Sequence, residues 1–204
     1  MPLKPLILLS MPQRLSAYFS RYRKLSDHEK TVIEQHAVIK SLPKGASLLR
    51  EGEAVRMNFF VLKGCIRQYY LADGQENTSN FFTEDDWIMP FVHHSRNGLS
   101  TYYLECLEET QLVVADNERG NAMLREFPEF QQIAQEVLEQ EIMRQQHALA
   151  KYINESAEQR YLSMQESRPD LINRLPQYLI ASYIGVKPES LSRIRRRIVR
   201  DVRG

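Results

Sequence analysis

The chain has few of the residues that metal-cluster chemistry needs. Its 204 residues include two cysteines, Cys65 and Cys106, and neither has a second cysteine within a few residues. The spacing of a zinc knuckle or an iron–sulfur site is therefore missing, and we expect two small buried residues. No Ser-His-Asp, Cys-His or phosphate-loop pattern stands out either. We expect a protein that is not an enzyme, with no catalytic residue, no metal and no cofactor beyond an unidentified small-molecule effector.

Long hydrophobic runs are missing as well. The apolar run Leu6–Leu9 follows Pro2 and Pro5 and is too short for a secretory signal or a membrane span. Hydrophobic residues make up 43% of the chain and charged residues 26%, which is typical of a soluble globular protein. With no export signal and few cysteines, we expect a cytoplasmic protein with no membrane partner.

The net charge of +1 hides an asymmetry along the chain. Residues 160–204 carry ten Lys/Arg against four Asp/Glu, whereas residues 1–159 carry 17 against 22. A basic end on an otherwise acidic chain indicates a module that binds a polyanion, because phosphate contacts supply much of the affinity for nucleic acid. Charge alone leaves a solvated basic tail as an equal alternative.

The first part of the chain predicts two short helices followed by a β domain. The helices are expected at Gln13–Tyr22 and Asp27–Ala37, the second capped by Ser26 or Asp27. From Val38 to about Ala115, short apolar and β-branched runs alternate with turn signals, which favours an antiparallel barrel or sandwich. The runs are Ser47–Leu49, Phe59–Leu62, Ile66–Leu71, Thr78–Phe82, Tyr102–Leu107 and Gln111–Ala115. Asp73-Gly74 is the clearest hairpin turn.

After Asn117 the pattern becomes helical. A short helix is expected at Asn117–Glu126, and a long helix from Pro128 to about Ser156. One stripe of the long helix is apolar and flanked by Gln and Glu: Ala134, Leu138, Ile142, Leu149 and Ile153. A narrow apolar seam on so long a helix favours a two-fold dimer over packing along the chain's own β domain.

Residues 177–197 have the spacing of a helix-turn-helix. The positions where two crossing helices bury their shared face are apolar: Ile180, Ile184, Val186, Leu191 and Ile194. Gly185 falls at the turn, where a left-handed residue is needed, and Pro188 suits the first turn of the second helix. A helical hairpin inside a core is the alternative, but it does not explain why the outward face is so basic.

That outward face supplies two groups of candidate DNA contacts. Side chains expected to read base edges are Glu189, Ser190, Ser192, Arg193 and Arg196. Side chains expected to hold phosphates are Lys187, Arg195, Arg197 and Arg200.

The chain resembles the CRP/FNR family of transcription regulators over nearly its whole length. The motifs that carry the resemblance are Pro43-Lys44-Gly45 with Glu51-Gly52-Glu53, Phe60-Val61-Leu62-Lys63-Gly64, Ser156-Ala157-Glu158-Gln159-Arg160-Tyr161, and Ile180-Ala181-Ser182-Tyr183-Ile184-Gly185-Val186 with Glu189-Ser190-Leu191-Ser192-Arg193. The resemblance implies an α+β fold with three parts. These are N-terminal helices and a jelly-roll-like antiparallel β-roll related to cyclic-nucleotide-binding domains (1–127), a dimerisation helix (128–156) and a winged helix-turn-helix whose final wing is short or missing (157–204).

The resemblance also implies a function. Glu189, Ser192 and Arg193 look like the base-reading trio of the FNR branch. The expected protein is a homodimeric regulator that binds a palindromic operator in double-stranded DNA, one half-site per protomer, with RNA polymerase as a further partner.

Two departures from the family bear on its effector. Nucleotide-binding members hold the ribose with a Gly-Glu pair and the cyclic phosphate with an Arg-Ser or Arg-Thr pair. Here no Gly-Glu follows Trp87, and no Arg stands directly before Ser100-Thr101. A buried phosphate needs a fixed cation or an amide nest, so we expect no tight binding of cyclic AMP. The cysteine cluster of the oxygen-sensing members is also missing.

The same region is a candidate pocket for another effector. The residues involved are Trp87, Met89, Phe91, Ser100, Thr101 and Tyr102. Such side chains line many ligand pockets, but they more often fill a small barrel.

Two alternative functions stay open at this stage. One is a ligand-binding module whose basic helix pair docks a protein. The other, less favoured, is a cupin-like metalloenzyme that would use Asp85-Asp86 and His93-His94, although the usual ligand spacing is missing.

Overall fold

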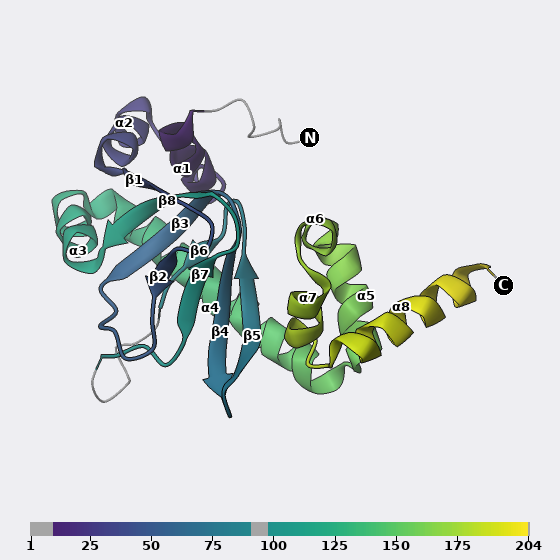
Figure 1. Ribbon diagram of the computed structural model, residues 1–204. Helices are drawn as coiled ribbons and strands as arrows, with labels where there is room; N and C mark the ends of the chain where they lie inside the picture. The colour runs from purple at the N-terminus through teal and green to yellow at the C-terminus, as the bar shows by residue number, and fades with distance from the viewer. Residues whose placement is uncertain (1–9, 91–97, 204) are drawn as a thin grey trace. The chain divides into compact units, whose positions relative to one another are not determined.

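The computed structural model describes residues 10–90 and 98–203, and the fold is a mixed α+β one (Figure 1). The chain forms two compact units, which are taken in turn below. The first combines residues up to 68 with residues 81–141, and the second combines residues 69–80 with residues 142 onward. The predicted α+β fold with an antiparallel β-roll is confirmed, while the three domain boundaries given above stay a prediction.

Two four-stranded sheets build the β-roll. The first has the order β1-β8-β3-β6 and the second the order β2-β7-β4-β5. The strands are β1 (Val38–Leu42), β2 (Ser47–Leu49), β3 (Met57–Lys63), β4 (Ile66–Ala72), β5 (Gln75–Phe82), β6 (Trp87–Ile88), β7 (Tyr103–Cys106) and β8 (Thr110–Asp116). The predicted turn between β4 and β5 is confirmed, because Asp73 and Gly74 both have positive φ, 52° and 73°.

Strand β3 is buried on both of its faces. Phe59 and Val61 point into the roll, where they join a core with Ile66, Leu104 and Leu112. Cys65 and Cys106 are buried free cysteines, as expected, and burial raises the pKa of the Cys106 thiol. The alternate residues of β3, Phe60 and Leu62, point to the other side and are fully buried as well.

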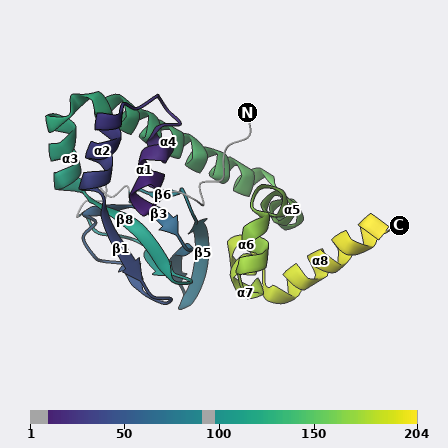
Figure 2. The same ribbon diagram turned by 90° about the horizontal axis from the view of Figure 1, so that it is seen from above.

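Helices cover that outer side of the first sheet (Figure 2). They are α1 (Met11–Phe19), α2 (Asp27–His36), α3 (Asn117–Glu126), the short 3₁₀ turn η2 (Pro128–Phe130) and the beginning of α4 (Gln131–Asn154). Their shared core includes Leu15, Ile33, Phe130, Ile133 and Val137. The long helix was predicted to begin at Pro128, but Pro128–Phe130 form a separate 3₁₀ turn and α4 begins at Gln131.

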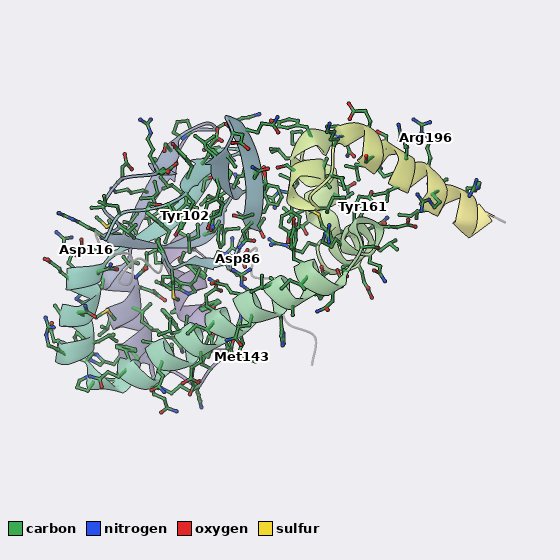
Figure 3. The ribbon with its side chains drawn as sticks, turned by 90° about the horizontal axis from the view of Figure 1, so that it is seen from below. Asp86, Tyr102, Asp116, Met143, Tyr161 and Arg196 are labelled. Carbon is green, nitrogen blue, oxygen red and sulfur yellow. The ribbon has the colours of Figure 1, made fainter. Side chains whose placement is uncertain are left out.

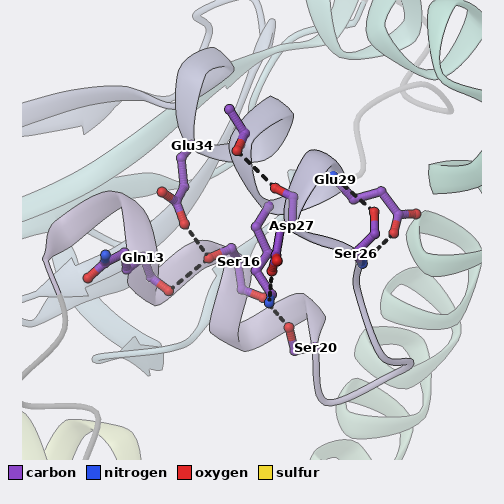
Figure 4. Close-up of polar contacts among 9 residues, drawn as sticks. Gln13, Ser16, Ser20, Ser26, Asp27, Glu29 and Glu34 are labelled. Carbon is purple, nitrogen blue, oxygen red and sulfur yellow. Dashed lines mark hydrogen bonds and ion pairs between the residues drawn. The ribbon is translucent and has the colours of Figure 1, made fainter.

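Local polar contacts fix α1 and α2 (Figure 4). Ser26 caps α2: its hydroxyl accepts from the Glu29 amide at 3.2 Å, and the Glu29 carboxylate accepts from the Ser26 amide at 2.7 Å. Glu29 also pairs with Arg23, and Ser16 of α1 donates to Glu34 of α2 at 2.7 Å. The Arg23 guanidinium, the largest cause, and the Ser26 amide lower the pKa of Glu29 to about 2.

The second unit is helical apart from residues 69–80, which form most of the β4–β5 hairpin. After the end of α4 come α5 (Ala157–Ser167), α6 (Pro169–Arg174), α7 (Gln177–Tyr183) and α8 (Pro188–Arg203). Its buried side chains include Tyr161, Leu171, Leu179, Ile180 and Leu191. Among the described residues, no helix is both long enough and apolar enough to cross a membrane.

Replacing Glu29 tests the cap of α2. We expect Glu29→Ala to lower the free energy of unfolding by about 1 kcal/mol, because the cap and the ion pair with Arg23 are lost together. The pKa of Glu29 is lower in the folded protein than in the unfolded chain, so its contribution is present above pH 4.5 and is lost as the pH falls towards 2. Urea unfolding at pH 7 and pH 3 should therefore show a smaller difference between wild type and variant at the lower pH, and an equal difference would contradict this account.

Candidate nucleic-acid interface

Helices α7 and α8 form the compact pair predicted from the spacing. The C-terminal end of α7 is closed by two backbone hydrogen bonds, from the Val186 amide to the Ala181 carbonyl at 2.9 Å and from the Gly185 amide to the Ser182 carbonyl at 3.1 Å. This is the pattern of a Schellman motif, which needs a left-handed residue at the position of Gly185. Gly185 has φ of 76°, as predicted for the turn.

The Tyr152 side chain of α4 lies next to Gly185. A Cβ at this position would lie 2.9 Å from the Tyr152 hydroxyl, the far end of a side chain that is 52% exposed and can shift. The positive φ is therefore the main reason for glycine here. Four members of the predicted shared face, Ile180, Ile184, Leu191 and Ile194, are at most 7% exposed, and Val186 is half-buried.

The Arg160 side chain on α5 holds this turn in place. Its guanidinium donates two hydrogen bonds to the Ile184 carbonyl, at 3.0 Å and 2.8 Å, and two more to the carbonyls of Tyr152 and Glu155. It also stacks over the Tyr152 ring, 4.6 Å from the centroid. Because the last carbonyls of a helix have no partner within the helix, one guanidinium satisfies the ends of both α4 and α7.

The outer face of α8 is polar and basic. The predicted base-reading side chains Glu189, Ser192, Arg193 and Arg196 are exposed, whereas Ser190 is half-buried. The Ser192 hydroxyl donates to the Pro188 carbonyl at 3.2 Å. Figure 3 shows Arg196 on α8 and Tyr161 on the neighbouring α5. Arg193 and Arg196 have no hydrogen-bond or ion-pair partner among the described residues, so both are free to meet a ligand.

Four arginines share one cleft on this face, with a volume of about 360 Å³. They are Arg193, Arg196, Arg197 and Arg200. Among the residues whose side chains the structure describes, only these arginines line the cleft, and their summed positive charge attracts an anion. The structure therefore brings together residues from both predicted groups, the base-reading and the phosphate-holding.

Arg195 and Arg197, two of the predicted phosphate contacts, are held by side chains of neighbouring helices. Arg195 donates to the Gln177 side chain at 2.6 Å, and Arg197 pairs with Glu158 at 2.8 Å. Both arginines and Lys187 are nevertheless exposed. Their partners belong to α7 and α5, so these ion pairs and hydrogen bonds also fix α8 against its neighbours.

The apolar stripe of α4 is exposed over most of its length. Leu138 is 37% exposed, and the value rises through Ile142 and Leu149 to 70% at Ile153. Ala134 is half-buried, and the neighbouring stripe, Ile133 and Val137, is the one that packs into the chain's own core. The predicted seam is therefore an uncovered face of the single chain.

The predicted effector residues do not face a common space. Trp87 and Met89 pack on the outer core under the helices, whereas Tyr102 packs on the core inside the roll. Ser100 is buried, and its hydroxyl both donates to and accepts from the backbone of Tyr102. Thr101 is exposed, and Phe91 lies outside the described residues, as do His93 and His94.

Sequence reasoning missed two residues that position this site. Arg160 lies in a motif used for the family resemblance, but nothing in the spacing of the sequence predicted its hydrogen bonds to the ends of α4 and α7. Ser182 of α7 accepts from the Thr78 amide at 2.9 Å and donates to the Glu76 carbonyl at 3.2 Å, both in the β4–β5 hairpin. Such contacts with distant carbonyls and amides leave no periodic signal in a sequence.

Comparison with known proteins identifies the fold. Residues 39–127 match the family model of the cyclic nucleotide-binding domain. No curated protein matches the sequence.

Solved structures of CRP/FNR-type regulators share the fold over most of the chain. The global regulator CLP of Xanthomonas campestris has a TM-score of 0.66 at 12% identity, with 82% of this chain and 88% of that chain covered. A protein described as a transcriptional regulator of the crp/fnr family from Eubacterium rectale has a TM-score of 0.66 at 16% identity, with 91% and 88% covered. The catabolite activator protein of Thermus thermophilus has a TM-score of 0.53 at 16% identity, with 88% and 86% covered. The resemblance to the CRP/FNR regulators is thus confirmed at the level of the fold.

Replacing Arg160 tests its role in positioning α7 and α8. We expect Arg160→Met, which keeps most of the aliphatic stem, to lower the free energy of unfolding by about 1.5–3 kcal/mol, because it leaves the terminal carbonyls of two helices without a donor. Arg160→Lys should lose nearly as much, since an ammonium cannot replace the planar fork. Hydrogen exchange should become faster at the amides of Gly185 and Val186. Unchanged exchange at both amides would show that the guanidinium does not hold the turn.

Proposed function

We propose that the protein is a sequence-specific DNA-binding transcription regulator of the CRP/FNR type that acts as a homodimer. The observation that carries the proposal is the four-arginine cleft on the exposed face of α8, the second helix of a helix-turn-helix pair. A helical hairpin buried in a core has no use for an exposed basic face. A helix that enters the major groove needs basic side chains on the face that meets the DNA.

The chemistry of α8 fits base reading in the major groove. Arg193 and Arg196 can each donate two hydrogen bonds to a guanine edge, and Glu189 can accept from cytosine. Arg197 and Arg200 line the same cleft and suit the flanking phosphates. Lys187 and Arg195, both exposed next to them, extend the basic surface.

The exposed stripe of α4 supports the dimer. Burying large apolar side chains on association is favourable by roughly 25 cal/mol per Å² of apolar surface removed from water. A parallel pair of α4 helices would cover Leu138, Ile142, Leu149 and Ile153 on each chain and would double the number of α8 helices. A two-fold protein then recognises a palindrome with half-sites one helical turn apart.

We further propose that cyclic AMP is not the effector. The hydroxyl of Ser100, at the position expected to meet the cyclic phosphate, already makes two hydrogen bonds to the Tyr102 backbone. The residue directly before it is Leu99, not an arginine. A buried phosphate needs a fixed cation, which Leu99 cannot supply.

Two arginine variants test whether Arg193 reads bases while Arg200 contacts phosphates. Arg193→Ala should weaken binding to the preferred operator by about 1–3 kcal/mol and relax the preference at one base position. Arg200→Ala should weaken binding to all sequences alike and reduce the slope of log K against log salt by about 1. Fluorescence anisotropy with the operator and with scrambled DNA, at several salt concentrations and with and without cyclic AMP, measures both effects.

Arg125→Ala is the matched control, since Arg125 is an exposed arginine on α3. It should leave affinity, specificity and salt slope unchanged, and cyclic AMP should change none of the curves. Equal effects of the Arg193 and Arg200 variants on scrambled DNA would contradict these separate roles. A wild-type protein that binds no DNA at low salt would instead favour docking of a protein.

A charge in the apolar stripe of α4 tests the dimer. Leu149→Glu should shift the protein from dimer to monomer in sedimentation velocity and weaken operator binding at least tenfold, because a carboxylate would be buried in the seam. His147→Glu adds the same charge on the opposite side of α4 and should leave the dimer intact. Dissociation by both variants, or by neither, would exclude this stripe as the seam.

A further inference from the structure

A cavity of about 380 Å³ lies within the first unit, on the helical side of the roll. Its walls come from α1 and α2, from β3, β6 and β8, and from α3, η2 and the first turn of α4. This is the outer side of the first sheet. Of the predicted effector residues that the structure describes, only Trp87 lines the cavity, whereas Tyr102 packs on the core inside the roll. A volume in this range is typical of pockets for small molecules.

The walls favour a neutral and mostly apolar occupant. Apolar side chains such as Leu15, Phe19, Ile33 and Phe130 dominate, and among the described residues neither lysine nor arginine lines the cavity. The acidic and basic side chains of this lining are Asp116 and His36. The carboxylate of Asp116 caps α3, accepting from the Glu118 and Arg119 amides at 2.9 Å and 3.1 Å. An anion would meet this carboxylate.

Trp87 supplies one polar group that lacks a partner. Its ring lines the cavity and packs against Phe60, Phe19 and Tyr18, with centroids 5.2, 6.0 and 6.5 Å away. Its Nε1–H is buried and has no hydrogen-bond partner among the described residues. Buried donors are almost always satisfied in native proteins, so a ligand with an acceptor oxygen would complete this one.

Gly120 leaves space unfilled where α3 forms part of the cavity wall. It lies in the interior of the helix without a positive φ, and a Cβ added there would meet no atom within 4 Å. Glycine is a poor helix former, so alanine or a larger residue would stabilise α3 if nothing else needed the space. The open wall is what a cavity for a ligand requires.

We propose that this cavity binds a small, neutral, mainly apolar molecule with one carbonyl or ether oxygen, which accepts a hydrogen bond from Trp87 Nε1. Monocyclic or bicyclic aromatic ketones and short acyl compounds have this chemistry and size. Ile133 and Ala134 of α4 form part of the wall, and Ala134 also begins the proposed dimer seam. A ligand in the cavity would therefore contact α4, the helix that carries the proposed dimer interface.

Prodan, a neutral naphthyl ketone whose emission shifts in apolar surroundings, is a suitable probe. Trp87 is the only tryptophan of the chain, so energy transfer from tryptophan to prodan reports binding next to this residue. With the full chain and no DNA present, we expect saturable binding at one site per chain, with a dissociation constant on the order of 10 μM. Because DNA is not involved, failure here leaves the proposed regulator function untouched.

Three variants locate the probe. Gly120→Leu should fill the cavity and weaken binding at least tenfold while α3 stays folded by circular dichroism. Gly120→Ala, the matched control, should retain binding and raise the melting temperature slightly. Trp87→Phe keeps an aromatic ring without the donor. Prodan, excited directly, should bind this variant about threefold to tenfold more weakly than wild type. A naphthalene without the ketone should bind wild type and Trp87→Phe alike.

Two results would overturn the proposal. Prodan that binds Gly120→Leu as tightly as wild type, or does not saturate, would place the probe elsewhere. Binding that appears only after deletion of residues 2–9 would mean that the chain's own apolar run, Leu6–Leu9, fills the cavity.

Discussion

The hydrogen bonds of the Arg160 guanidinium hold the ends of α4 and α7 together. A helix leaves its last carbonyls without partners, and here α4 and α7 end close to each other. One planar side chain donates to the carbonyls of Tyr152, Glu155 and Ile184 and thereby fixes the turn that precedes α8. The close approach of Tyr152 to Gly185 follows from the same arrangement. With its buried side fixed in this way, α8 presents its arginines outward.

The β-roll obeys a different constraint, which is the burial of β3 on both faces. One set of its side chains fills the roll, and the alternate set needs a cover, which the N-terminal helices, α3 and the start of α4 provide. This cover is built from short helices around bulky aromatic residues and does not close completely. The cavity next to Trp87 and Gly120 is the result.

Much of the architecture could be predicted from the sequence because it depends on local chemistry. The Asp73-Gly74 turn, the ends of α3, the Gly185 turn and the start of α8 at Pro188 depend on caps, glycines and prolines. Features that depend on distant parts of the chain were predicted less well. The sequence grouped Trp87 with Tyr102, but Trp87 lies in β6 of the first sheet and packs under the helices, whereas Tyr102, just before β7 of the second sheet, packs on the core inside the roll. Similarly, Pro128 suits the first turn of a helix, yet the packing of Phe130 made it part of a separate 3₁₀ turn.

Selection of binding sites from random double-stranded DNA tests the central claim most directly. If two α8 helices are joined by the α4 seam, the selected sequences should converge on a palindrome whose half-sites are centred about ten to eleven base pairs apart. Each half-site should contain guanines opposite Arg193 and Arg196. Enrichment of a single, unpaired half-site would contradict the dimer, and no enrichment above the starting pool would contradict sequence-specific binding of DNA.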